Sequence, residues 1–66
     1  MVRHDEVKIG DVIVYRHVDW IDLILRVSDD SVEVLKFTSD GEARFQTIRP
    51  VDGVLTFVGE FMRRSD

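Results

Sequence analysis

The chain has 66 residues, of which 44% are hydrophobic and 33% charged, with a formal net charge of −4 and no cysteine. This length supports one domain at most, and the hydrophobic content is enough for a core, so a disordered chain is not expected. Disulfides and thiolate zinc sites are excluded, and the acidic charge disfavours indiscriminate binding to nucleic acid.

The N-terminal segment "MVRHDEVKIG" is charged and lacks the apolar stretch of a signal peptide. Apolar runs elsewhere span only a few residues, too short to cross a membrane. We therefore expect a cytoplasmic protein whose residues 1–66 form a single domain. Residues 1–6 are expected to be a frayed terminus.

The first expected strand covers residues 12–15, "VIVY", because β-branched and aromatic residues follow a Gly-Asp turn. In the next segment, residues 20–28, apolar side chains alternate with others at positions 21, 23, 25 and 27. This period of two predicts a strand, although Trp20, Leu23, Ile24 and Val27 also fit helical spacing. A single helical turn near residues 18–22 stays open as an alternative.

The rest of the chain reads as strands separated by turns, because Asp, Ser and Gly cluster between β-prone runs. Asp-Gly at positions 40–41 predicts a two-residue hairpin, since both residues tolerate positive φ. The triplet "VDG" predicts another turn at residues 51–53. The three strands expected here are residues 31–39, 42–50 and 54–64.

Five short strands in so small a chain predict an all-β domain, built as a small barrel or a strongly bent antiparallel sheet. The opening "VKIGDVIVYR" resembles the first strand of SH3-like small barrels of the KOW and Tudor type. The residues that carry the resemblance are Ile9, Gly10, Asp11, Val12 and Val14. It implies a five-stranded SH3-like barrel, and it is a likeness of fold.

The densest group of chemically active residues is "HVDWID", with His17, Asp19 and Asp22. Catalytic zinc sites commonly take three protein ligands, often two or three histidines, and this chain has only two histidines. On a strand, Asp22 would also point away from the other two side chains. No serine lies in a nucleophile elbow. We therefore expect no metal, no cofactor and no enzymatic activity.

Trp20, the only tryptophan, is the strongest lead to a function. An aromatic face beside carboxylates suits a cation, and tryptophan is enriched at interface hot spots. In peptide-binding SH3-like barrels, acidic loop residues beside aromatics receive Arg or Lys, so the resemblance implies the same role here. The competing interpretation places Trp20 in the core or in a dimer interface. The candidate protein-binding residues are Tyr15, His17, Asp19, Trp20 and Asp22.

The leading hypothesis is a non-enzymatic protein-binding module, able to form a homodimer, of the kind that a phage or mobile element uses to dock on a host protein. Small size, high apolar content and acidic charge motivate it. The alternative is a KOW-like nucleic-acid-binding barrel in transcription or translation, which the resemblance implies if the bases of the second half of the chain form one face. Its candidate contacts are Lys36, Arg44, Arg49, Arg63 and Arg64.

Overall fold

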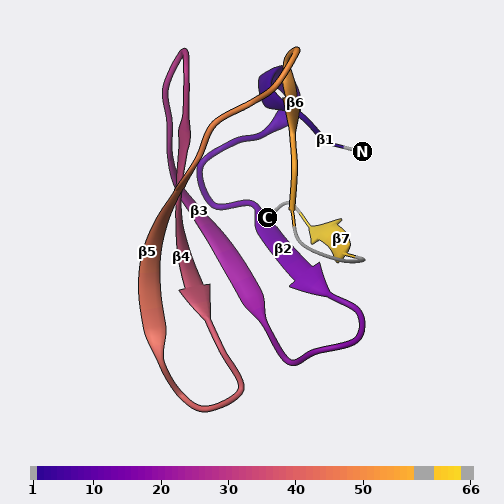
Figure 1. Cartoon of the computed structure of the whole chain (residues 1–66), viewed down its shortest axis with the longest axis vertical. Helices are drawn as coiled ribbons and strands as arrows, with labels where there is room; N and C mark the ends of the chain where they lie inside the picture. The colour runs from indigo at the N-terminus through magenta and orange to yellow at the C-terminus, as the bar shows by residue number, and fades with distance from the viewer. Residues whose placement is uncertain (1, 58–60, 65–66) are drawn as a thin grey trace.

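The computed structural model describes residues 2–57 and 61–64 (Figure 1). Its main element is a five-stranded antiparallel sheet. In order across the sheet, the strands are β5 (Ala43–Ile48), β4 (Val32–Phe37), β3 (Ile21–Val27), β2 (Val12–Tyr15) and β7 (Phe61–Arg64). A second, two-stranded sheet joins β1 (Val2–Arg3) to β6 (Val54–Leu55), and the 3-10 turn η1 (His4–Glu6) follows β1.

The predicted all-β class and the five-stranded antiparallel sheet are confirmed. Strands β2 and β3 run obliquely to β4 and β5, as the right-handed twist of β-strands requires (Figure 1). The sheet does not close into a barrel among the described residues, since β5 and β7 stand at its two ends without pairing to each other.

Two local expectations differ from the structure. A helical turn near residues 18–22 is wrong, because residues 16–19 form a bend and β3 begins at Ile21. In place of a frayed terminus, Val2 pairs with Leu55 and is only 5% exposed. Burying a valine and pairing its backbone hold this segment against the main sheet.

The expected final strand, residues 54–64, is divided between the two sheets. Its first part, β6, pairs with β1, and its last part, β7, pairs with β2. Phe57, after β6, is buried in the core. Phe57 and Phe61 therefore both contact the core, although β6 pairs with β1 and β7 pairs with β2.

The two-residue turn of this chain lies at Asp52-Gly53 and not at the predicted Asp40-Gly41. Asp52 and Gly53 both have positive φ, 52° and 75°, and Val51 and Val54 exchange both backbone hydrogen bonds, so this is the two-residue turn. At the predicted Asp40-Gly41 hairpin only Gly41 has positive φ, 85°. Thr38 N–H donates to the Glu42 carbonyl, so the loop has three residues and the two-residue prediction is wrong.

The core lies on one face of the five-stranded sheet, which we call the inner face. Sheet residues here include Ile13, Ile24, Val32 and Val34, each at most 1% exposed. Residues Val2, Val7, Leu55 and Phe57, from the segments that carry β1 and β6, complete the core cluster. The inner face of the sheet therefore packs against the layer formed by the segments that carry β1 and β6.

The phenylalanines of the central hairpin do not join this core. Large aromatic residues in a strand are expected to pack inward, but Phe37 is 42% exposed and Phe45 is 80% exposed, so this expectation is wrong for both. Val32 and Val34 occupy the inner face of β4, and the alternation of a strand sends Phe37 to the opposite face. Phe45 lies directly across from Leu35 on that same face.

Candidate functional site

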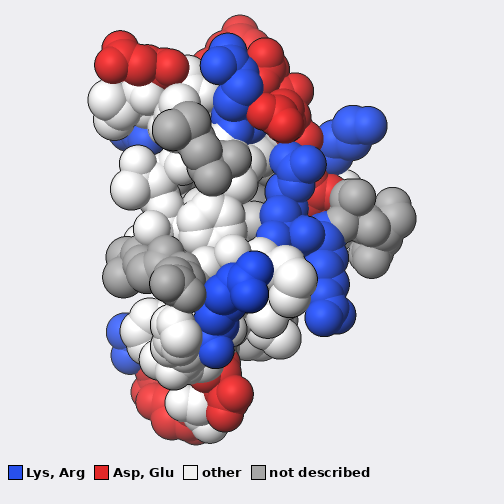
Figure 2. All heavy atoms as spheres, turned by 90° about the vertical axis from the view of Figure 1, so that its right-hand side faces the viewer, with Lys and Arg blue, Asp and Glu red and all other residues white. Residues whose placement is uncertain are grey.

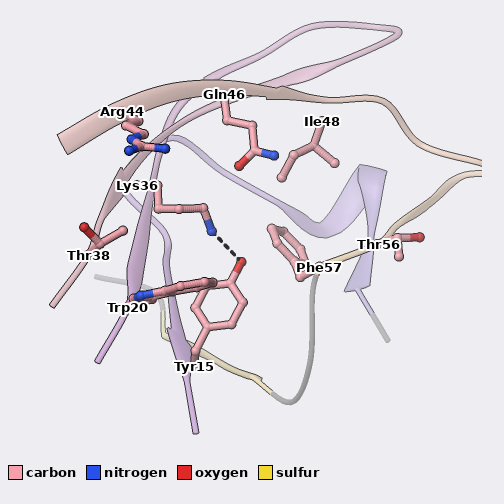
Figure 3. Close-up of a pocket in the computed structure, with 9 residues that line it drawn as sticks. All are labelled: Tyr15, Trp20, Lys36, Thr38, Arg44, Gln46, Ile48, Thr56 and Phe57. Atoms are coloured by element: carbon pink, nitrogen blue, oxygen red, sulfur yellow. Dashed lines mark hydrogen bonds between the residues drawn. The ribbon is translucent and has the colours of Figure 1, made fainter. Parts of the chain in front are cut away.

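A hollow of about 220 Å³ opens on the inner face, near the end of the sheet that carries the β4–β5 turn. Figure 3 shows Trp20 and Tyr15 on one side of it and the side chains of β5 on the other, with Lys36 between them. Phe57 and Thr56 close its far end. The lining residues are Tyr15, Trp20, Lys36, Thr38, Arg44, Gln46, Ile48, Thr56 and Phe57.

At the base of the hollow is a buried ionic group, which we call the Tyr-Asp-Lys triad: Tyr15, Asp22 and Lys36. Asp22 and Lys36 lie directly opposite each other on β3 and β4. Lys36 Nζ is 3.1 Å from Asp22 Oδ1, and the two side chains are 15% and 0% exposed. The Tyr15 hydroxyl donates to Asp22 Oδ2 at 2.7 Å, and Lys36 Nζ donates to the hydroxyl at 3.2 Å.

The triad is the one place in the described core where a carboxylate is fully buried in the sheet. Among the described residues, Asp22 Oδ1 accepts no hydrogen bond, so the ammonium charge of Lys36 is its compensation. Removing a charge from water is costly unless a partner is held close. The first role of Lys36 is therefore structural, as the counter-ion of Asp22.

Trp20 is half-buried and packs against the core from the side of the hollow. Its ring meets that of Tyr15 edge-to-face, with 5.9 Å between centroids and 77° between planes. Lys36 Nζ lies 4.5 Å from the Tyr15 ring centroid and 5.1 Å from that of Trp20. The cation beside these two rings is the chain's own lysine, and a contact with a basic side chain of a partner stays a prediction.

The pKa of Tyr15 is raised well above its ordinary value of 10. Burial of the phenol is the main cause, and the hydrogen bond to Asp22 and its negative charge act in the same direction. The hydroxyl therefore stays protonated through the neutral range and keeps donating to Asp22.

A second hollow, of about 300 Å³, lies on the other side of Trp20 beside the β4–β5 turn, and its lining includes Asp40 and Glu42. The Thr38 hydroxyl and the Glu42 amide donate to the Asp40 carboxylate and lower its pKa, so Asp40 is ionised at neutral pH. Arg44 Nε donates to Glu42 at 3.0 Å. Trp20 and Arg44 line both hollows and form the ridge between them.

The candidate protein-binding residues from the sequence separate into two environments. Tyr15 and Asp22 are buried in the triad, and Trp20 stands half-buried above it. His17 and Asp19 are exposed in the bend between β2 and β3. Asp22 belongs to β3 and not to the loop, so it is sealed from any partner while Trp20 stays accessible.

The five basic candidates do not come together as one free surface. Lys36 is mostly covered and pairs with Asp22, Arg44 pairs with Glu42, and Arg49 Nη1 is 3.8 Å from Asp30. Arg63 donates to the Glu6 carbonyl, and Arg64 follows it on β7. Seen from the side on which β7 lies, Lys and Arg side chains form a band with acidic side chains at both ends (Figure 2).

Arg44 also lies on a different face from the one expected. Because it alternates with Phe45, the sequence suggests that Phe45 packs inward and Arg44 points out. The structure reverses the two faces, and Arg44 lines the hollow while Phe45 lies on the far side of the sheet. Both residues are more than half exposed, so the polarity of either one is a poor guide to its face.

Sequence reasoning missed Lys36 as the partner of Asp22, and it missed Gln46, Asp40 and Glu42 as lining residues. Lys36 could have been found, because it alternates in phase with Val32 and Val34, and a lysine on an apolar face needs a counter-ion if the position is buried. The other three depend on the register of β4 and β5, which only the fold defines.

Comparisons with models of known families, with curated proteins and with solved structures find no match to this chain. Among residues 2–57 and 61–64, no helix is long and apolar enough to span a membrane.

Proposed function

We propose that the chain is a non-enzymatic protein-binding module, and that the ridge formed by Trp20 and Arg44, with its two hollows, receives a segment of the partner. The observation that carries the proposal is the position of Trp20. It is held edge-on by Tyr15 from below and keeps part of its ring accessible between two hollows. A rigid aromatic at the centre of a contact surface is the usual source of binding energy.

The chemistry of the second hollow favours a basic side chain of the partner. Asp40 is ionised, Glu42 lies beside it, and the exposed part of the Trp20 ring forms the adjacent wall. Lys36 already neutralises Asp22, so its charge does not oppose an approaching cation strongly. Arg44 is likewise neutralised by Glu42. A lysine or arginine between Trp20 and Asp40 would gain both an ionic and a cation–π contact.

The shape of the site also supports recognition of a protein segment over a small molecule. Small-molecule sites are enclosed cavities of about 300–1,000 Å³. The two hollows, about 220 and 300 Å³, are at or below the lower limit and share an exposed ridge. The triad presents no free nucleophile or base to the two hollows, because Tyr15, Asp22 and Lys36 each form a hydrogen bond or ion pair with another member.

Selection from a displayed library of peptides should therefore enrich sequences with a basic residue next to an apolar one. Because Trp20 is the only tryptophan, its fluorescence reports binding directly. We expect a selected peptide to change this emission on titration, and Asp40→Asn to weaken its affinity about tenfold, as the loss of one charged contact implies.

Asp29→Asn is the matched control, since Asp29 is an exposed acid in the β3–β4 turn at the opposite end of the sheet (Figure 1). Trp20→Phe should also reduce the affinity for the peptide while the far-ultraviolet dichroism stays that of the folded chain. Because this variant lacks the fluorescent tryptophan, its affinity is measured by calorimetry. Failure of the library to enrich any peptide, or equal affinities for the Asp40 and Asp29 variants, would contradict the proposal.

The wider biological setting stays a proposal of the same kind: a cytoplasmic accessory factor, of phage or mobile-element type, that docks on a host protein. An SH3-like relationship is compatible with the meander of β2 to β5, with β7 returning beside β2. The KOW-like nucleic-acid alternative stays an untested prediction, and binding to labelled RNA or DNA that falls steeply with salt would support it.

A further inference from the structure

The face of the five-stranded sheet opposite the core, which we call the outer face, carries an apolar area that extends across all five strands. The strand registers place the side chains of this area in two rows, and a third, polar row of Arg26, Glu33 and Thr47 borders it toward the β3–β4 turn. The first row is Arg64, Val12, Leu23, Leu35 and Phe45. The second row is Met62, Val14, Ile21, Phe37 and Ala43.

Nine of these ten positions are apolar, one is arginine and none is acidic, in a chain where a third of the residues are charged. Four of them are among the exposed large hydrophobic residues: Ile21 at 42%, Phe37 at 42%, Phe45 at 80% and Met62 at 40%. An antiparallel sheet with one face in water normally alternates apolar and polar residues. Apolar residues on both faces are the pattern of a sheet that is covered twice.

The size of this surface suits an interface. With about 200 Å² for an aromatic side chain, Phe37 and Phe45 together expose roughly 240 Å². Five strands spaced about 4.8 Å apart, with rows about 7 Å apart, make a face roughly 20 Å across.

We infer that the outer face is a homodimer interface, in which a second copy of this chain packs its own outer face against the first. The rows are complementary to themselves under a twofold axis parallel to β3, the central strand. This axis places β5 over the partner's β7 and β4 over the partner's β2. Large residues then meet small ones, because Phe37 faces Val14 and Met62 faces Ala43 across the axis.

The same axis gives the one charge in the rows a partner. Arg64, at one end of its row, lies opposite Phe45 at the other end of the second copy's row, so the guanidinium can stack on an open aromatic ring. Ile21 and Leu23 lie on the axis and meet their own copies. The result is a sandwich of two aligned sheets, a common packing of β-sheets, with the two Trp20 ridges on its opposite outer surfaces.

Sedimentation of the full chain at micromolar concentration tests the inference. We expect twice the 7.7 kDa mass for the wild type and the mass of one chain for Phe45→Arg, which sets two arginines against each other across the interface. Adding Arg64→Glu to Phe45→Arg should restore the dimer, because the new pair is oppositely charged. Gln46→Arg, the neighbouring position on the inner face, is the matched control and should remain dimeric.

A wild type that sediments as a monomer, or a Phe45→Arg variant that stays dimeric, would overturn the inference. Loss of the dimer without rescue by Arg64→Glu would overturn the parallel twofold arrangement. Far-ultraviolet dichroism confirms that each variant is folded, since position 45 is 80% exposed and outside the core. The dimer does not depend on the proposed function: a monomeric Phe45→Arg chain should still bind a selected peptide at Trp20.

Discussion

Replacing Lys36 with methionine should lower the free energy of unfolding by about 3–5 kcal/mol, the usual cost of leaving one member of a buried ion pair without its partner. Methionine fills similar volume, so the loss reports the charge and not a cavity. Asp22 would keep its hydrogen bond from Tyr15 but lose the Lys36 ammonium that lies 3.1 Å from its Oδ1. Urea unfolding followed by circular dichroism measures the change.

A second substitution separates charge from packing. In the Lys36→Met background, Asp22→Asn should recover much of the lost stability, because the amide carries no charge to leave uncompensated. Arg49→Met is the control, since Arg49 and Asp30 form a pair whose side chains are 73% and 80% exposed. Exposed pairs contribute about 0–1 kcal/mol. Equal losses for Lys36→Met and Arg49→Met would show that the buried pair has no special role.

The stability of the chain should fall at alkaline pH because of Tyr15. Its pKa in the folded state lies above the ordinary value of 10 that applies when the chain is unfolded. The contribution is therefore complete below pH 10 and is lost as the pH rises from there toward the folded-state pKa. The loss amounts to about 1.4 kcal/mol for each pH unit, or up to about 2.7 kcal/mol by pH 12.

Tyr15→Phe isolates this effect from the titration of the lysines. At neutral pH the variant should lose about 1.5–3 kcal/mol, because a hydrogen bond to a buried carboxylate is gone. Between pH 10 and pH 12 its stability should decline less steeply than that of the wild type. Tyr15 is the only tyrosine, so ultraviolet absorbance of the phenolate follows the same titration directly. Parallel stability curves for the two proteins would contradict the assignment.

Much of the fold could be predicted from local sequence, because turns and β-prone runs act over short distances. The strands at residues 12–15 and within 20–28, 31–39 and 42–50 all form where the alternation indicates. The predicted turn at residues 51–53 also forms between strands. The local pattern does not identify the strand with which each strand pairs. For this reason the sequence predicts one strand over residues 54–64, where the structure has two.

The sequence singles out three residues of the candidate site, and that they bind a partner stays a prediction. Tyr15 contacts both Trp20 and Asp22, and the ammonium of Lys36 lies beside both aromatic rings. The source of that cation could not be predicted, since Lys36 comes from another strand and reaches Asp22 only through the β3–β4 register. His17 and Asp19, which are next to Trp20 in sequence, stay outside the triad because the bend of residues 16–19 turns them to solvent.

The sequence by itself determined the all-β class and the positions of most strands, because these follow from composition, turn residues and a period of two. The alternation predicted over residues 21–27 is broken by a register shift between Ile24 and Arg26, which pairs Val27 with the inner-face Val32. Only the tertiary structure decided which face of each strand became the core. On β3, Asp22 and Ile24 are inside while Ile21 is 42% exposed, although the apolar set on the other face is larger. Alternation defines two faces, but the layer that covers one of them comes from chain segments distant in sequence, here those of β1 and β6. A buried aspartate can lie on that face only because Tyr15 and Lys36 converge on it from the neighbouring strands.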